Sequence, residues 1–122
     1  MKKVAGLSFF LFGLNIWFIR ELLAVEYLDQ MGSIEGAFIA IARWVAKNWS
    51  DLSWFPLWYG GIPFQNTYPP LLHLINAAVV STGGIAPGLA YHAVTAVAYS
   101  LGPVTLFWLG LHLSRSATYS FA

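Results

Sequence analysis

Residues 69–113 read PPLLHLINAAVVSTGGIAPGLAYHAVTAVAYSLGPVTLFWLGLHL, and they give the clearest indication of the fold class. It belongs to a longer run, from Leu52 to Ser114, that contains no Asp, Glu, Lys or Arg. A water-soluble domain of this size has too much surface to leave such a run uncharged. In a bilayer the run is expected, because a charge at the centre of a membrane helix costs roughly 2.5–3.5 kcal/mol. The sequence therefore predicts an all-α, polytopic transmembrane protein.

The stretch 69–113 is expected to hold the second and third transmembrane spans. Proline is tolerated in the first turn of a helix, so a helix is predicted from Pro69-Pro70 to Gly83-Gly84. Its length of about 22 Å is short of the ~30 Å hydrocarbon core, so it either tilts in a thinned region or continues through the glycines. Residues 86–113 are long enough to cross, and Pro103 predicts a kink there.

Residues 1–25 are predicted to form the first span. Bulky residues at 17–20 stand where a signal peptide needs small ones, so this segment is expected to stay uncleaved. Lys2 and Lys3 predict a cytoplasmic N-terminus by the positive-inside rule. The predicted location is thus the cell (inner or plasma) membrane, with multi-pass topology and residues 26–68 as an extracytoplasmic loop. Residues 114–122 are expected to begin a further loop of a truncated reading frame.

An amphipathic helix is predicted over residues 33–49 of that loop, with Ser33 as its N-cap. At helical spacing one face is apolar and another is charged. This pattern is typical of a helix lying in the membrane interface. The apolar face holds Ile34, Phe38, Ile41, Val45 and Trp49, and the charged one holds Glu35, Arg43 and Lys47.

Residues 52–68 form a second part of the loop, in which prolines and paired glycines exclude a regular helix. Its aromatic side chains suit the headgroup layer, so membrane lipids are expected partners. The net charge of +1, without a basic stripe, predicts no nucleic-acid partner. The absence of cysteine excludes disulfides and zinc–thiolate sites.

Two segments that follow the predicted first span resemble, in their sequence and order, a known class of membrane proteins. Residues 35–43 read EGAFIAIAR, and residues 54–61 read WFPLWYGG, followed by Tyr68-Pro69-Pro70. Together they resemble the N-terminal part of the GT-C class of membrane glycosyltransferases, whose loop helix reads like Glu-Gly-x-Tyr-x-x-x-Ala-Arg. They also look like bacterial membrane proteins described as related to pyruvoyl-tetrahydropterin synthase. The resemblance covers roughly residues 5–115.

The resemblance implies transfer of a sugar from a polyprenyl-phosphate donor to an extracytoplasmic acceptor. It gives Glu35 the role of catalytic base or ligand of a divalent metal. The family's first acidic residue is missing, because Ile34 stands in its place and Asp29 is out of register. Arg43 and Lys47 lie on the side of Glu35 and would bind the donor phosphate. The substrate loop would present aromatic side chains, namely Trp54, Trp58, Tyr59 and Tyr68.

Simpler interpretations stay open for each of these residues. Glu35 also suits the first turn of a helix, where it favours the dipole. Arg43 and Lys47 also suit solvent or headgroups, and His73 and His92 also suit neutral hydrogen bonds to neighbouring helices. Since three spans cannot enclose donor, acceptor and loop, this segment alone is expected to be inactive. The alternative function is a small non-enzymatic membrane protein, such as an assembly or accessory subunit.

Overall fold

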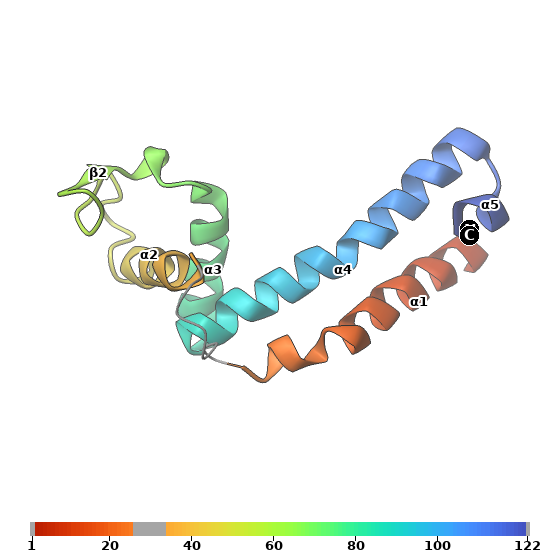
Figure 1. Ribbon diagram of the computed structural model, residues 1–122, viewed down its shortest axis with the longest axis horizontal. Helices are drawn as coiled ribbons and strands as arrows, with labels where there is room; N and C mark the ends of the chain where they lie inside the picture. The colour runs from red at the N-terminus through yellow and green to blue at the C-terminus, as the bar shows by residue number, and fades with distance from the viewer. Residues whose placement is uncertain (1, 26–33, 122) are drawn as a thin grey trace. The chain divides into compact units, whose positions relative to one another are not determined.

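The computed structural model describes residues 2–25 and 34–121, and it is mostly helical (Figure 1). The chain divides into two compact units, Met1–Ala24 with Ala93–Ala122, and Val25–His92. The helical fold class predicted from composition is therefore confirmed. Glu26, Asp29 and the predicted cap Ser33 lie outside the described residues.

The helix α4 (Pro87–Ser114) is the candidate membrane span. Its 28 residues measure about 42 Å, which exceeds the ~30 Å hydrocarbon core. It is 17% buried over its most apolar window, whereas the core helix of a soluble protein is mostly buried. Within the described ranges it is the one helix both long and apolar enough to cross a membrane. The helix continues through Pro103, and the predicted kink there stays a prediction.

The helix α1 (Lys2–Phe18) is shorter than the predicted span of residues 1–25. The chain continues as a 3-10 turn, η1 (Arg20–Leu23). Arg20 ends the helix because its side chain folds back, donating from Nη1 to the Trp17 carbonyl oxygen at 2.9 Å and lying over the Trp17 ring at 4.9 Å. None of the residues of α1 is buried.

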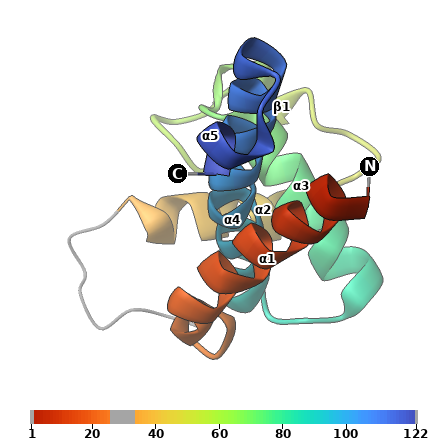
Figure 2. The same cartoon turned by 90° about the vertical axis from the view of Figure 1, so that its right-hand side faces the viewer.

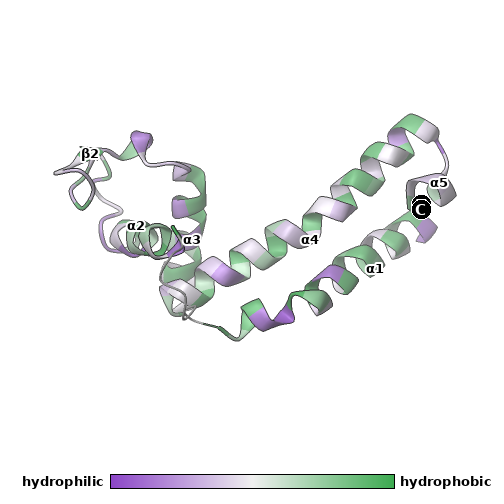
Figure 3. Ribbon diagram, viewed as in Figure 1, coloured by the Kyte–Doolittle hydropathy of each residue, from purple (hydrophilic) through white to green (hydrophobic). Residues whose placement is uncertain are grey.

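Within the first unit, α1 and the later part of α4 run antiparallel (Figures 1 and 2). The Trp108 indole N–H donates to Ser8 Oγ at 3.0 Å. A turn at Arg115, which has a positive φ of 54°, leads into the short helix α5 (Ala117–Phe121). The ring of Phe121 lies 6.2 Å from that of Phe10, so α5 folds back against α1. Figure 3 shows apolar residues along the length of α1 and α4.

The second unit begins with α2 (Glu35–Lys47), two residues shorter at each end than the predicted 33–49. Next come the strands β1 (Trp54–Phe55) and β2 (Ile62–Pro63), paired antiparallel, and the 3-10 turn η2 (Phe64–Asn66). The expected irregular loop thus contains a small hairpin. Gly61 has a φ of 112°, and a Cβ there would lie 2.3 Å from the Trp54 indole nitrogen.

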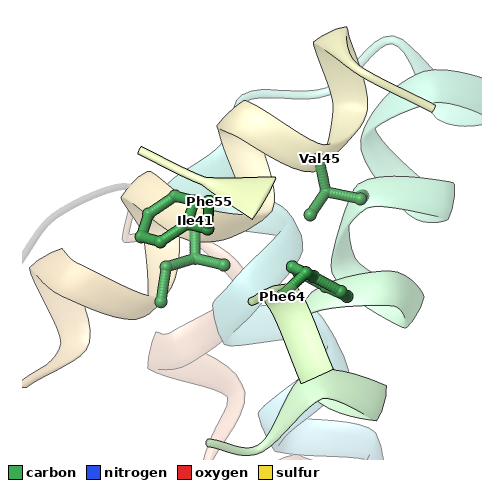
Figure 4. Close-up of a cluster of buried hydrophobic side chains, with 5 residues drawn as sticks. Ile41, Val45, Phe55 and Phe64 are labelled. Atoms are coloured by element: carbon green, nitrogen blue, oxygen red, sulfur yellow. The ribbon is translucent and has the colours of Figure 1, made fainter. Parts of the chain in front are cut away.

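The core of this unit lies between α2, the hairpin and α3 (Pro70–Gly83). Five buried side chains form it, of which four are labelled in Figure 4: Ile41, Val45, Phe55, Phe64 and Ala77. The predicted apolar face of α2 therefore packs into this core at Ile41 and Val45, with Phe38 partly buried against it. Two others on that face, Ile34 and Trp49, are exposed.

The helix α3 ends at Gly83 and does not continue through the glycines. Gly84 adopts the left-handed conformation with φ 62°, and its N–H donates to the Val80 carbonyl oxygen at 3.0 Å. At 14 residues α3 measures about 21 Å, which is short of a bilayer core. The second span expected over residues 69–83 is thus a shorter apolar helix, and α4 is the single candidate span in the described parts of the chain.

Candidate functional site

A partly buried carboxylate–imidazole pair joins the beginnings of α2 and α4. Glu35 Oε1 lies 2.5 Å from His92 Nε2, and the two side chains are 12% and 3% exposed. The other ring nitrogen, Nδ1, lies 2.5 Å from the carbonyl oxygen of Val25. His92 therefore links Glu35 to the backbone just after η1.

The partners of His92 fix where its hydrogens lie. A carbonyl oxygen only accepts hydrogen bonds, so Nδ1 carries a hydrogen and donates it to Val25. The contact between Nε2 and Glu35 then needs one further proton, on the nitrogen or on the carboxyl group. In the form with an ionised Glu35, His92 is an imidazolium that donates from both nitrogens. The pair is then a closed, charge-assisted contact with zero net charge.

Aromatic rings surround this pair. The ring of Tyr91 lies 5.9 Å from that of His92 and 6.4 Å from that of Phe38. Phe38 in turn meets the ring of His73 edge-on at 5.2 Å. The carboxylate of Glu35 thus lies beside apolar ring surfaces, where electrostatic interactions are stronger than in water.

His73 and Asn76 are fully buried on α3. Neither ring nitrogen of His73 has a partner at hydrogen-bonding geometry, although the Tyr68 backbone is close enough to interact with the ring. Asn76 donates from Nδ2 to the Leu72 carbonyl oxygen, while its Oδ1 has no partner. The hydrogen bond to a neighbouring helix that sequence reasoning allowed is found for His92 and not for His73.

The two predicted phosphate-binding residues, Arg43 and Lys47, have exposed side chains. They follow Glu35 by about two and three turns of α2. Glu35 is 12% exposed, whereas both cations on the same helix are exposed. Exposed cations of this kind suit an anionic headgroup or a phosphate.

The aromatic residues predicted to form a substrate loop divide into two groups. Trp54, Tyr59 and Tyr68 are exposed by 52%, 86% and 79%. Trp58 is partly buried, stacks on Tyr59 with ring centres 5.7 Å apart, and lines a cavity of about 120 Å³ together with Ile41 of α2. An exposed aromatic face of this kind suits a sugar ring or the headgroup layer.

Asp51 shapes the entry to this loop. Its Oδ1 accepts hydrogen bonds from the Ser53 hydroxyl at 2.7 Å and from the Ser53 backbone N–H at 2.9 Å. The Ser53 hydroxyl, followed by the backbone N–H, lowers the pKa of Asp51 below its ordinary value. These bonds form a turn of the kind that aspartate favours.

A metal site would need more ligands than this pair supplies. Among the residues that the structure describes, no three His, Cys, Asp or Glu side chains lie close enough together to hold an ion. Glu35 and His92 are two side chains of a type that metals bind. Divalent metal dependence stays a prediction.

Sequence reasoning singled out Glu35 and did not pair it with His92. The available signal was an ionisable residue inside an apolar helix, which points to a function by default. The described residues form a mostly helical protein with one candidate membrane span and a partly buried acid–histidine pair. Comparisons with protein-family models, curated proteins and solved structures found no match to this chain.

Proposed function

We propose that this chain is the N-terminal part of a membrane glycosyltransferase that transfers a sugar from a polyprenyl-phosphate donor to an extracytoplasmic acceptor. The observation that carries the proposal is the contact between Glu35 and His92, because it holds a carboxylate in one orientation in a partly buried setting. A general base needs such positioning before its basicity matters. The resemblance of residues 35–43 to the GT-C loop helix supports the same assignment.

The proposed reaction uses Glu35 to take the proton of an acceptor hydroxyl. The hydroxyl oxygen forms a bond to the anomeric carbon while the bond from that carbon to the phosphate oxygen breaks. The proton ends on Glu35, and the electron pair leaves with the polyprenyl phosphate. Arg43 and Lys47, both exposed, would stabilise the charge on that leaving group. His92 acts as a positioning residue that keeps Oε1 in place.

We further propose that two helices, α1 and α4, cross the membrane and that α3 lies on the extracytoplasmic side. The helix α1 measures about 26 Å, and its 3-10 extension adds about 8 Å. Because α1 and α4 run antiparallel, Lys2 and Lys3 lie at the same end of the pair as Arg115. The positive-inside rule places that end in the cytoplasm. This arrangement supports the proposed multi-pass topology with a cytoplasmic N-terminus.

The topology is tested with single cysteines, since the chain has none of its own. Cysteines at Gln65 before α3 and at Thr82 near its end should both react with an impermeant thiol reagent applied to intact cells. A cysteine at Thr118 in α5 should react only after lysis. Labelling of the Gln65 and Thr82 positions from opposite sides would show that α3 crosses, and the two-span proposal would be wrong.

The catalytic proposal is tested by following labelled sugar from polyprenyl-phosphate donors into membrane-bound acceptors. Membranes containing the full-length protein should transfer label, and Glu35→Gln should abolish transfer without lowering the amount of inserted protein. The amide keeps the shape of the side chain and removes its charge. Ile34→Asp should be tolerated. Transfer by Glu35→Gln at the parent rate would remove Glu35 from the mechanism.

One observation favours the alternative, a small non-enzymatic membrane protein such as an assembly or accessory subunit. The Glu35–His92 pair is nearly closed to solvent, so it serves equally well as a structural link between α2 and α4. In that case Glu35→Gln should reduce stability without any loss of a chemical activity. The same variant, measured for both properties, distinguishes the two functions.

A further inference from the structure

An apolar groove runs between α1 and α4 within the first unit. One part of it is a cavity of about 400 Å³, lined from α1 by Ala5, Phe9 and Phe12 and from α4 by Leu101, Val104 and Trp108. A second part of about 560 Å³ shares Ala5 and Trp108 and extends to Leu111 and Lys2. The two parts therefore adjoin, and the groove follows α1 for about 15 Å.

The floor of the groove is bridged at one point by a polar contact. The Trp108 indole N–H donates to Ser8 Oγ, so the polar atoms of both residues are occupied by each other. What the groove offers to an occupant is then almost wholly hydrocarbon. Such a surface suits an acyl chain, which is the material that surrounds a membrane-spanning helix.

The end of the groove is cationic, because Lys2 lines it. Lys3 follows in the same turn, and Arg115 comes directly after α4 at the same end of the pair. In the described parts of the chain these three residues have no ion-pair partner. The one described acid of this unit, Glu21, lies beyond the other end of α1 beside Arg20. Among the described residues, no acidic side chain forms an ion pair with these three cations.

We propose that this groove binds an anionic phospholipid, with one acyl chain between α1 and α4 and the phosphate at Lys2. Charge and shape select the same occupant, since an apolar channel of this length ends at a lysine that has no ion-pair partner among the described residues. A basic side chain near an anionic bilayer surface attracts it by about 1 kcal/mol. The proposal does not depend on sugar transfer, because its residues all lie outside the Glu35–His92 site.

The test counts lipids retained by the purified full chain. The protein is extracted in mild detergent, mixed with equal amounts of phosphatidylglycerol and phosphatidylcholine, and examined by native mass spectrometry. One phosphatidylglycerol per chain should remain bound, in preference to phosphatidylcholine. Lys2→Gln should lower the preference for phosphatidylglycerol about fivefold. The variant should still retain one lipid molecule, because the apolar groove is unchanged.

Filling the groove should remove the lipid altogether. Ala5→Trp and Val104→Trp place an indole in the groove from opposite helices, so both should lose the bound lipid. Ala98→Trp adds the same ring at an exposed position of α4 outside the groove and should keep it.

Three outcomes would overturn the proposal. Equal retention of both lipids by the parent chain would remove the role of the cations. Retention by both groove-filling variants would show that the lipid lies elsewhere. A dimer that these variants dissociate would show that a second copy of the chain, not a lipid, occupies the groove.

Discussion

The contact between His92 and Glu35 allows the sharpest prediction, because removing one ring breaks two hydrogen bonds. His92→Phe keeps a ring of similar size and removes the two contacts that His92 makes, with Glu35 Oε1 and with the carbonyl oxygen of the partly buried Val25. A hydrogen bond contributes about 0.5–1.5 kcal/mol, and one to a charged group about 1.5–3 kcal/mol. The free energy of unfolding should therefore fall by about 2–4 kcal/mol.

The assay is equilibrium unfolding in mixed micelles, followed by helical circular dichroism. His112→Phe is the matched control, since His112 is exposed near the other end of α4, and it should change stability by less than about 0.5 kcal/mol. A cycle with Glu35→Gln and the double variant should give a coupling energy of about 1–2 kcal/mol between the two residues. Additive effects would refute the contact, and so would equal losses from His92→Phe and its control.

Three further predictions concern the second unit. Ile41→Asp should lower the free energy of unfolding by a few kcal/mol, because Ile41 is 1% exposed. Ala40→Asp on the same helix should lower it much less, because Ala40 is exposed. Equal loss of folded protein in detergent from the two variants would contradict this core. Gly61→Ala should displace the Trp54 indole, because the added Cβ would lie 2.3 Å from it. The displacement should alter the tryptophan fluorescence spectrum. An unchanged spectrum would count against this hairpin. The pKa of Asp51 is lowered from 3.8, so its hydrogen bonds stabilise the loop fully above that pH. This stabilisation is lost as the pH falls through the lower pKa of the folded state. In an NMR titration, the midpoint for Asp51 should lie below that of the same residue in an unfolded reference peptide.

The sequence predicted the parts of the fold that depend on local pattern. The third predicted segment, 86–113, differs from α4 by one residue at each end, because an unbroken apolar run is a strong signal. The predicted 33–49 contains the whole of α2, because apolar and charged residues alternate there at helical spacing. Both signals lie within one segment and need no knowledge of what it contacts.

What the sequence did not predict depends on contacts between distant residues or on side-chain geometry. The end of α1 at Phe18 depends on Arg20 folding back over Trp17. The short helix α5 depends on a left-handed residue at Arg115, and five residues carry no periodicity. The pairing of Glu35 with His92 joins residues 57 positions apart, and a single sequence holds no record of that distance.

The enclosed polar atoms of α3 have a consequence for the interior of the second unit. His73 and Asn76 lie one turn apart, are both fully buried, and together keep three side-chain atoms without a hydrogen bond. Each such atom costs about 1–3 kcal/mol when water is excluded, which is a large share of a small unit's total stability. The packing of α3 against its neighbours therefore includes buried polar atoms that lower the free energy of unfolding. A hydrocarbon ring in place of His73 would remove two of these three atoms, so the native histidine makes this unit less stable than its packing would allow.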